Sequence, residues 1–175
     1  FCGSGTILAE ALMQCSKIPA SYLRKNFGFM HLPDFDKKLW EKIKNESDSA
    51  ISELPENLIY GSDIDKDAIN AAKYNMRNLP FGDKINLSQQ NFENCNIDNS
   101  FIITNPPYGI RLENKKTVVV LYKKLSDLLI GSQNTTAVIY VGDKSLKDLI
   151  KLTPVYEKTL VNGALNGSLL KYEID

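Results

Sequence analysis

The chain has 175 residues, of which 43% are hydrophobic and 24% are charged, which is the balance of an ordinary globular domain that needs no disulfides. Its 21 basic residues equal its 21 acidic residues, so no net charge attracts a polyanion, although a local basic patch is still allowed. Cys2, Cys15 and Cys95 are too few and too widely spaced for a disulfide framework or a zinc site. No apolar run approaches the roughly 18 residues of a membrane span. We therefore expect a cytoplasmic protein with reduced thiols, no metal and no membrane partner.

The first part of the chain begins in a turn and continues with helices. The residues from Phe1 to Thr6 form a glycine-rich turn of the kind that normally follows a buried strand. We therefore expect the first strand of the sheet, and more of the protein, to lie upstream of this chain. Apolar residues at helical spacing predict a helix over 4–15, which Pro19 ends. An ordered loop then leads to an amphipathic helix over 36–53.

Strands and helices alternate over the rest of the chain. We expect strands over 58–64, 84–92, 101–104 and 136–142, helices over 65–79 and 117–130, a short helix from about 144, and final strands over 155–161 and 168–174. This order predicts an α/β fold with an open, mostly parallel, doubly wound sheet and a C-terminal antiparallel hairpin. Ligands of such sheets bind at the carboxyl ends of the strands.

The glycine turn is the first candidate binding segment. Gly3 and Gly5 let the backbone approach a ligand closely, and the helix after them presents backbone N–H groups at its first turn. The turn has neither the third glycine of a dinucleotide motif nor the Lys-Ser/Thr pair of a phosphate loop. It therefore suits a ligand whose negative charge is an amino-acid carboxylate, and a plain structural turn is the alternative.

The second candidate is the segment Gly-Ser-Asp-Ile-Asp at the end of the strand over 58–64. An acidic residue at this position can accept hydrogen bonds from the vicinal hydroxyls of a ribose. Asp63 fits this role better than Asp65, which is the natural cap of the next helix. Ile64 could lie against an adenine ring. The alternative is that both aspartates only start the helix.

The third and most specific candidate is the sequence Asn105-Pro106-Pro107-Tyr108, which follows an apolar strand. Prolines fix the backbone, so that an Asn side-chain oxygen and a proline carbonyl can both accept hydrogen bonds from one amino group. These bonds would hold the nitrogen lone pair toward an electrophile. Tyr108 offers a flat surface to a base that has left its stack. A proline-rich surface turn is the alternative.

The motifs FCGSGT, GSDID and NPPYG resemble those of an RNA methylase family whose better-known bacterial members are 23S rRNA guanine methyltransferases with an upstream THUMP RNA-binding domain. The segments FGFMHLPDFDKKLW and VNGALNGSLLKYEI extend the resemblance over nearly the whole chain. The resemblance implies a Rossmann-like class I methyltransferase fold, S-adenosylmethionine as cofactor and ribosomal RNA as substrate. It also implies that residues 1–175 are one catalytic domain with a THUMP-type domain upstream.

Carried over residue by residue, the resemblance assigns the cofactor to Phe1, Cys2, Gly3, Ser4, Gly5, Thr6, Asp63 and Ile64, and the target base to Asn105, Pro106, Pro107 and Tyr108. Asn91 stands where many methyltransferases have an aspartate that contacts the adenine amino group, and its side-chain oxygen could still accept. Phe92 would stack on the adenine. The Asp-Pro pair that normally precedes the glycine turn in this family is absent here.

Other functions remain open at this point, because the motif Asn105-Pro106-Pro107-Tyr108 also suits other planar amino groups. The protein could methylate the amino group of adenine in DNA or RNA, or a glutamine of release factors. A catalytically silent binding module with the same fold is a third possibility. The leading prediction is methylation of the exocyclic amino group of a guanine in 23S rRNA.

Overall fold

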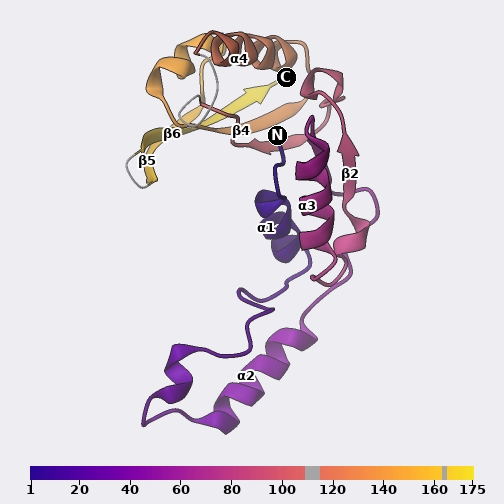
Figure 1. Cartoon of the computed structure of the whole chain (residues 1–175), viewed down its shortest axis with the longest axis vertical. Coiled ribbons are helices and arrows are strands. Elements are labelled where there is room, and N and C mark those ends of the chain that lie inside the picture. The colour runs from indigo at the N-terminus through magenta and orange to yellow at the C-terminus, as the bar shows by residue number, and fades with distance from the viewer. Residues whose placement is uncertain (109–114, 163–164) are drawn as a thin grey trace. The chain divides into compact units, whose positions relative to one another are not determined.

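The computed structural model describes residues 1–108, 115–162 and 165–175, which form two units (Figure 1). The N-terminal unit consists of Cys2–Gln89 and the C-terminal unit of Gln90–Asp175 together with Phe1. The elements of the N-terminal unit are α1 (Thr6–Cys15), the 3-10 turn η1 (Gly28–His31), α2 (Lys37–Ser49), β1 (Tyr60–Asp63), α3 (Lys66–Met76), η2 (Gly82–Lys84) and β2 (Asn86–Gln89). The elements of the C-terminal unit are η3 (Phe92–Asn94), β3 (Phe101–Thr104), α4 (Lys115–Ile130), β4 (Thr135–Val141), η4 (Lys144–Leu149), β5 (Tyr156–Asn162) and β6 (Leu165–Ile174).

The N-terminal unit is built on the parallel pair β1–β2, and α1 and α3 supply its helices. Apolar residues from these elements form one hydrophobic cluster, in which Leu12 and Leu54 are fully buried. Gly61 of β1 allows close packing, because a Cβ atom there would lie 2.4 Å from the side chain of Leu8 on α1. Asp65 caps α3 by accepting a hydrogen bond from the backbone N–H of Asp67 over 2.9 Å, as the sequence predicts.

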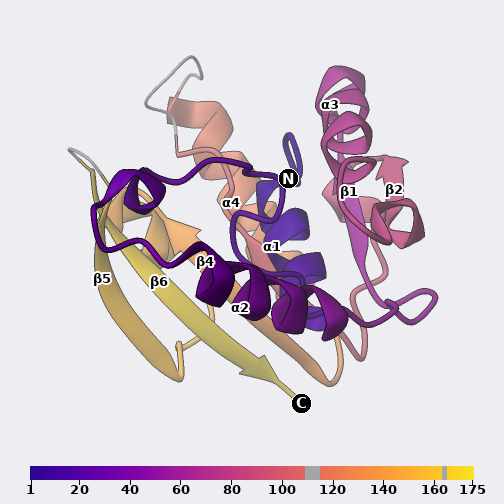
Figure 2. The ribbon, with the colours of Figure 1, turned by 90° about the horizontal axis from the view of Figure 1, so that it is seen from below.

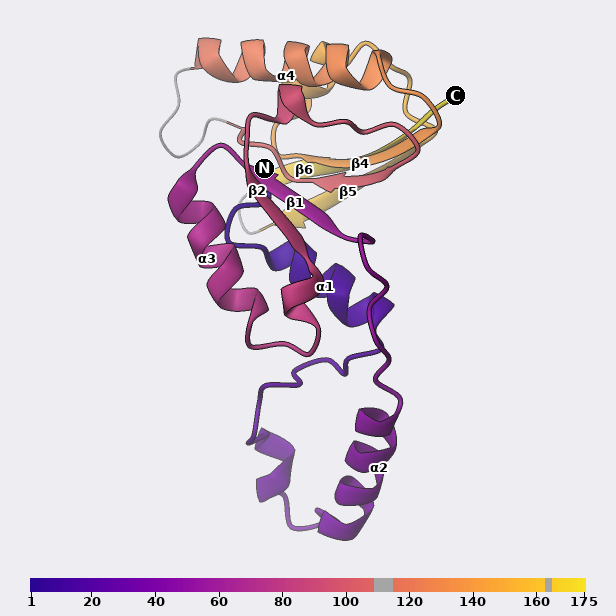
Figure 3. The same ribbon diagram turned by 90° about the vertical axis from the view of Figure 1, so that its right-hand side faces the viewer.

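Residues 17–53 form an insert in this unit, which ends in η1 and α2 (Figure 3). Both ends of the insert meet at its base, where the N–H of Ser52 donates to the carbonyl of Ser16 over 2.9 Å. Four aromatic rings hold the outer part together with centroid distances of 5.1–5.9 Å, namely Phe27, Phe29, Phe35 and Trp40. No residue of η1 or α2 is fully buried, and the guanidinium group of Arg24 lies over the Phe27 ring, 5.1 Å from its centroid.

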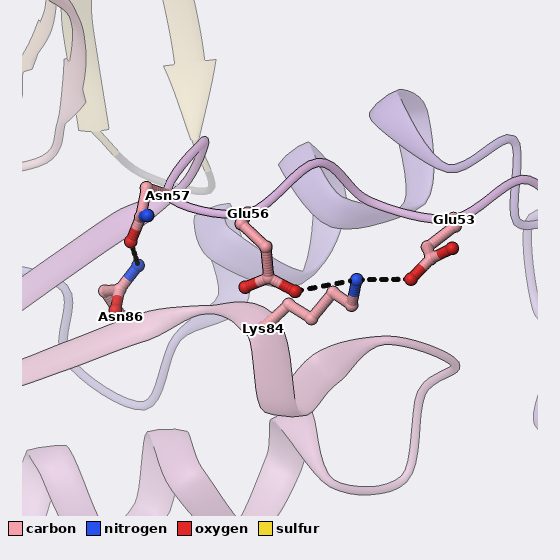
Figure 4. Close-up of polar contacts among 5 residues, drawn as sticks. All are labelled: Glu53, Glu56, Asn57, Lys84 and Asn86. Atoms are coloured by element: carbon pink, nitrogen blue, oxygen red, sulfur yellow. Dashed lines mark hydrogen bonds and ion pairs between the residues drawn. The ribbon is translucent and has the colours of Figure 1, made fainter.

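Lys84 fixes the returning end of the insert to η2 (Figure 4). Its ammonium group lies 2.5 Å from a carboxylate oxygen of Glu53 and 2.8 Å from one of Glu56. Nearby, the side-chain amide of Asn86 at the start of β2 donates to that of Asn57 over 3.4 Å. These contacts join the chain that enters β1 to the neighbouring strand.

The C-terminal unit contains a four-stranded sheet in the order β3-β4-β6-β5. The pair β3–β4 is parallel, whereas β6 runs antiparallel to both β4 and β5. Helix α4 covers one face of this sheet, and β5 and β6 form a long hairpin (Figure 2). Tyr122 of α4, Ile139 of β4 and Leu170 of β6 are fully buried in the cluster between helix and sheet.

The predicted α/β alternation and the C-terminal antiparallel hairpin are confirmed. The described strands lie in two sheets rather than in the single sheet expected. The final strand begins at Leu165 instead of 168, so Gly167 is a ladder residue and not part of the turn. Within the ladder Gly167 packs closely on Tyr140, since a Cβ atom at Gly167 would lie 2.4 Å from the hydroxyl oxygen of Tyr140. The expected loop before α2 includes η1, and the short helix after residue 143 is a 3-10 helix.

Candidate active site

The glycine turn is bonded to the carboxyl end of β1. The backbone N–H of Cys2 donates to the carbonyl of Ser62 over 2.9 Å, and the N–H of Gly3 donates to Oδ2 of Asp63 over 2.9 Å. The other carboxylate oxygen of Asp63, Oδ1, accepts from the N–H of Asp65 over 3.1 Å. The predicted cofactor residues Gly3 and Asp63 are therefore in direct contact, and Asp63 also shapes the turn itself.

Both glycines of the turn have left-handed backbone conformations, with φ of 53° at Gly3 and 85° at Gly5. Gly5 packs against α3, since a Cβ atom there would lie 3.1 Å from Met76 and 3.2 Å from Ala72. Gly3 is different, because among the described residues no heavy atom outside its chain neighbours lies within 4 Å of the position its Cβ would take. In that part of the structure the backbone of Gly3 therefore adjoins open space that a ligand can enter.

The N-terminus of α1 follows directly. Gly5 is its N-cap, and no described side chain caps the first turn of the helix with a hydrogen bond. The backbone N–H groups of this first turn can bind an anion. Thr6, in the same turn, is exposed, and so is Ile64 after β1, which is 67% exposed.

Asn75 is a further residue of this region that the sequence analysis did not identify. Its side-chain amide donates to the carbonyl of Ser4 over 2.9 Å and so ties the turn to α3. Nothing in the spacing of α3 distinguishes Asn75, because the partner lies 71 positions away along the chain.

Cys2 is not an activated nucleophile. Burial raises the pKa of its thiol, and the carboxylate of Asp63 raises it further. A thiol with a raised pKa carries little thiolate at neutral pH. Cys2 also packs against the hydrophobic cluster of the N-terminal unit, and Cys2, Cys15 and Cys95 form no disulfide with one another.

Three predicted cofactor residues belong to the C-terminal unit, namely Phe1, Asn91 and Phe92. The rings of Phe1 and Phe92 contact each other with a centroid distance of 4.7 Å. Asn91 caps η3: its side-chain oxygen accepts from the N–H of Glu93 over 3.2 Å, and its amide donates to the Glu93 carboxylate over 2.9 Å. Lys124 of α4 donates to the same carboxylate over 2.9 Å. The Asn91 side chain thus has a structural role, and its contact with an adenine stays a prediction.

The residues Asn105 to Tyr108 follow the carboxyl end of β3, as the sequence predicts. Pro106 is less than 2% exposed and anchors the segment, while the Asn105 side chain is exposed. The Tyr108 ring meets that of Tyr140 edge-on at 6.2 Å. Gly109, the last residue of the motif, and Arg111, which could meet an RNA phosphate, lie outside the described residues.

The chemistry available differs between the two units. The N-terminal unit offers backbone donors, a carboxylate and open space beside a glycine. The C-terminal unit offers an exposed amide and an aromatic ring after a buried proline. Across the described ranges, no group of three or more His, Cys, Asp or Glu side chains is arranged to hold a metal. No helix within those ranges is long and apolar enough to cross a membrane.

The family described as "RMKL-like, methyltransferase domain" matches residues 1–171. The chain belongs to this family. A relative in Synechocystis sp., named "Putative RNA methyltransferase slr0064", is 32% identical over 176 residues, which cover 99% of this chain and 46% of the relative. A second relative, "Ribosomal RNA large subunit methyltransferase K/L" of Shewanella loihica, is 34% identical over 180 residues, which cover 99% of this chain and 25% of the relative.

A solved structure confirms the α/β methyltransferase fold. The protein SMU.472, whose crystal structure was determined with SAH, is 28% identical and superimposes with a TM-score of 0.89, covering 99% of this chain and 46% of that one. This chain therefore spans about half the length of two of these relatives and a quarter of the third.

Proposed function

We propose that the protein transfers a methyl group from S-adenosylmethionine to the exocyclic amino group of a guanine in 23S ribosomal RNA. The observation that carries the proposal is the hydrogen bond between Gly3 and Asp63 beneath an open backbone turn. It supports a site for a ligand with both an amino-acid end and a ribose. The family, the SAH of a solved relative and the name of the Shewanella relative support the cofactor and the substrate class.

The residues of the N-terminal unit fit the cofactor. The first-turn N–H groups of α1 would bind the carboxylate of the methionine part, and the open space over Gly3 leaves room for it. Asp63 would accept hydrogen bonds from the ribose hydroxyls, besides those that it accepts from Gly3 and Asp65. Ile64, with its exposed side chain, offers an apolar contact to the adenine.

The bound cofactor would supply an electrophilic methyl group on a positively charged sulfur. Asn105 would accept a hydrogen bond from the guanine amino group through its side-chain oxygen, and the carbonyl of Pro106 would accept the second. These bonds orient the nitrogen lone pair, and orientation accounts for much of the rate of such a transfer. Tyr108 would stack on the base. The methylated nitrogen then loses one proton to water, so the reaction needs no general base with a shifted pKa.

The test uses the purified protein at its full natural length. It is incubated with unmodified ribosomal RNA and S-adenosylmethionine labelled in its methyl group, and the digested nucleosides are identified by mass spectrometry. We expect label in N2-methylguanosine and its loss in Asn105→Ala. Asn70→Ala, a change at an exposed position of α3, is the matched control and should retain full activity.

Other outcomes would redirect the assignment. Label in N6-methyladenosine would keep the chemistry and move the substrate to adenine. Label in a release-factor glutamine, with none in RNA, would overturn the RNA assignment. Retained activity in Asn105→Ala would overturn the role of the motif.

A further inference from the structure

Gly142 lies against the face of the Tyr108 ring. A Cβ atom at Gly142 would come within 2.7 Å of Cγ, 2.7 Å of Cδ2 and 2.8 Å of Cδ1 of Tyr108. Three such similar distances mean that the glycine faces the flat side of the ring and not its edge. Gly142 is itself buried.

The backbone around both residues explains why they meet. Gly142 follows the last residue of β4, and Tyr108 lies four positions after the end of β3. The strands β3 and β4 are parallel neighbours, with Thr104 opposite Ile139. Their carboxyl ends therefore lie at the same edge of the sheet, and the two segments leave it side by side.

Glycine contributes the absence of a side chain at position 142, and not an unusual backbone conformation. The φ angle of Gly142 lies outside the left-handed region, so an L-residue could adopt the same backbone. Atoms that Cβ would approach within 3 Å must move, and normal carbon contacts begin near 3.5 Å. Any side chain at position 142 therefore displaces the Tyr108 ring by roughly 1 Å.

Tyr140 supports the same ring from another side. It meets Tyr108 edge-on at 6.2 Å and in turn packs on Gly167, where a Cβ atom would lie 2.4 Å from the Tyr140 hydroxyl oxygen. Tyr108 thus packs on Gly142, and Tyr140 packs on Gly167. Pro106, fully buried, fixes the backbone just before Tyr108.

We propose that Gly142 is a positioning residue for methyl transfer, which acts by seating the Tyr108 ring on which the target base stacks. The inference rests on the function proposed above. It adds a residue beyond the acceptor motif, because Gly142 would touch neither the base nor the cofactor. A side chain at position 142 would leave the affinity for the cofactor unchanged and would displace the target base that stacks on Tyr108.

The test compares Gly142→Ala with the wild-type protein under single-turnover conditions, with labelled cofactor and ribosomal RNA. A 1 Å displacement near a reacting group can lower a rate about 100-fold, and we expect that fall in the rate of methyl transfer. The dissociation constant of S-adenosylmethionine, measured by calorimetry, should stay within about twofold. Gly131→Ala is the matched control, because its Cβ would lie 3.4 Å from the nearest atom, an ordinary contact.

A double mutant separates positioning from general packing. In a Tyr108→Ala background the clash is gone, so adding Gly142→Ala should change the remaining rate by less than about twofold. An equal loss in both backgrounds would overturn the proposal. So would a Gly142→Ala protein with the wild-type rate. Failure of the wild-type protein to methylate RNA would instead count against the proposed function.

If Gly142→Ala does not fold at the assay temperature, Tyr140→Leu tests whether the packing around the Tyr108 ring matters, without adding atoms beside Gly142. We expect a lower rate of methyl transfer with unchanged cofactor affinity. Tyr140→Phe keeps the ring and should match the wild-type protein. A wild-type rate in Tyr140→Leu would then overturn the proposal.

Discussion

Gly3 donates its backbone N–H to the Asp63 carboxylate over 2.9 Å, although 60 positions separate the two residues. One side chain at the end of β1 therefore holds the glycine turn and is also the candidate partner of the cofactor ribose. Loss of Asp63 would therefore affect the glycine turn and cofactor binding at once.

Replacing Asp63 by Ala should weaken binding of S-adenosylmethionine about 10- to 100-fold, because hydrogen bonds to a charged group contribute about 1.5–3 kcal/mol. Calorimetry measures the change. The matched control is Asp65→Asn two positions later, which keeps the cap of α3 and should leave affinity unchanged. Equal affinity in Asp63→Ala and the wild-type protein would refute the role.

The two glycines of the turn should respond differently to Ala. The left-handed conformation costs an L-residue about 1–2 kcal/mol at either position. Gly5→Ala adds close contacts with Met76 and Ala72, so it should lower the free energy of unfolding more than Gly3→Ala does. Gly3→Ala places its methyl group in the open space and should mainly weaken cofactor binding. Urea denaturation together with calorimetry distinguishes these effects, and the reverse order would contradict them.

The contacts of Lys84 should make stability depend on pH in the acidic range. The hydrogen bond from Lys84 holds the pKa of Glu53 below its ordinary value of 4.5. Because the pKa of Glu53 is lowered in the folded state, its ionised carboxylate stabilises the protein at pH values above 4.5. This stabilisation is lost as the pH falls through the folded-state pKa. Lys84→Met should therefore lower the melting temperature at neutral pH, and the difference from wild type should shrink as the pH falls below about 4.

The effect should be modest, because Glu53 and Glu56 are largely exposed and salt screens such pairs. Lys66→Met provides the matched control on α3 and should show little change at any pH. A difference between Lys84→Met and wild type that is constant with pH would argue against the ion pairs as its cause.

Tyr172 of β6 should be replaceable by Phe with a gain in stability. Its side chain is 1% exposed, and its hydroxyl has no hydrogen-bond partner among the described residues. Leaving a buried hydroxyl unsatisfied costs about 1 kcal/mol or more, so Tyr172→Phe should raise the free energy of unfolding by about that amount. The exposed Tyr156 of β5 serves as the control, and Tyr156→Phe should be neutral.

The same variant should be less sensitive to alkali. Burial, with a smaller effect of the Glu157 charge, raises the pKa of Tyr172 to about 12. Because the folded state holds the phenol proton more tightly, this titration does not affect the free energy of unfolding below the unfolded-state pKa of about 10. The free energy of unfolding then falls as the pH rises toward the folded-state pKa. The wild-type protein should lose stability over this range faster than Tyr172→Phe. Parallel pH profiles of the two proteins would show that the phenol remains solvated.

The sequence by itself determined the local elements and the positions of the candidate residues. The apolar period of α1 and α3, the cap at Asp65 and the prolines after β3 act over a few residues, so they can be read along the chain. The same local rules put Asp63 at the end of a strand and Asn105 at the end of another.

Only the tertiary structure decided which distant residues meet. It placed β6 between β4 and β5, because Leu170 and Tyr172 fill the core while β5 stays exposed at the edge. It also brought Asn75 to the turn and Gly142 to Tyr108. These pairs depend on the shape of packed side chains, and shape complementarity between remote segments leaves no periodic pattern in the sequence.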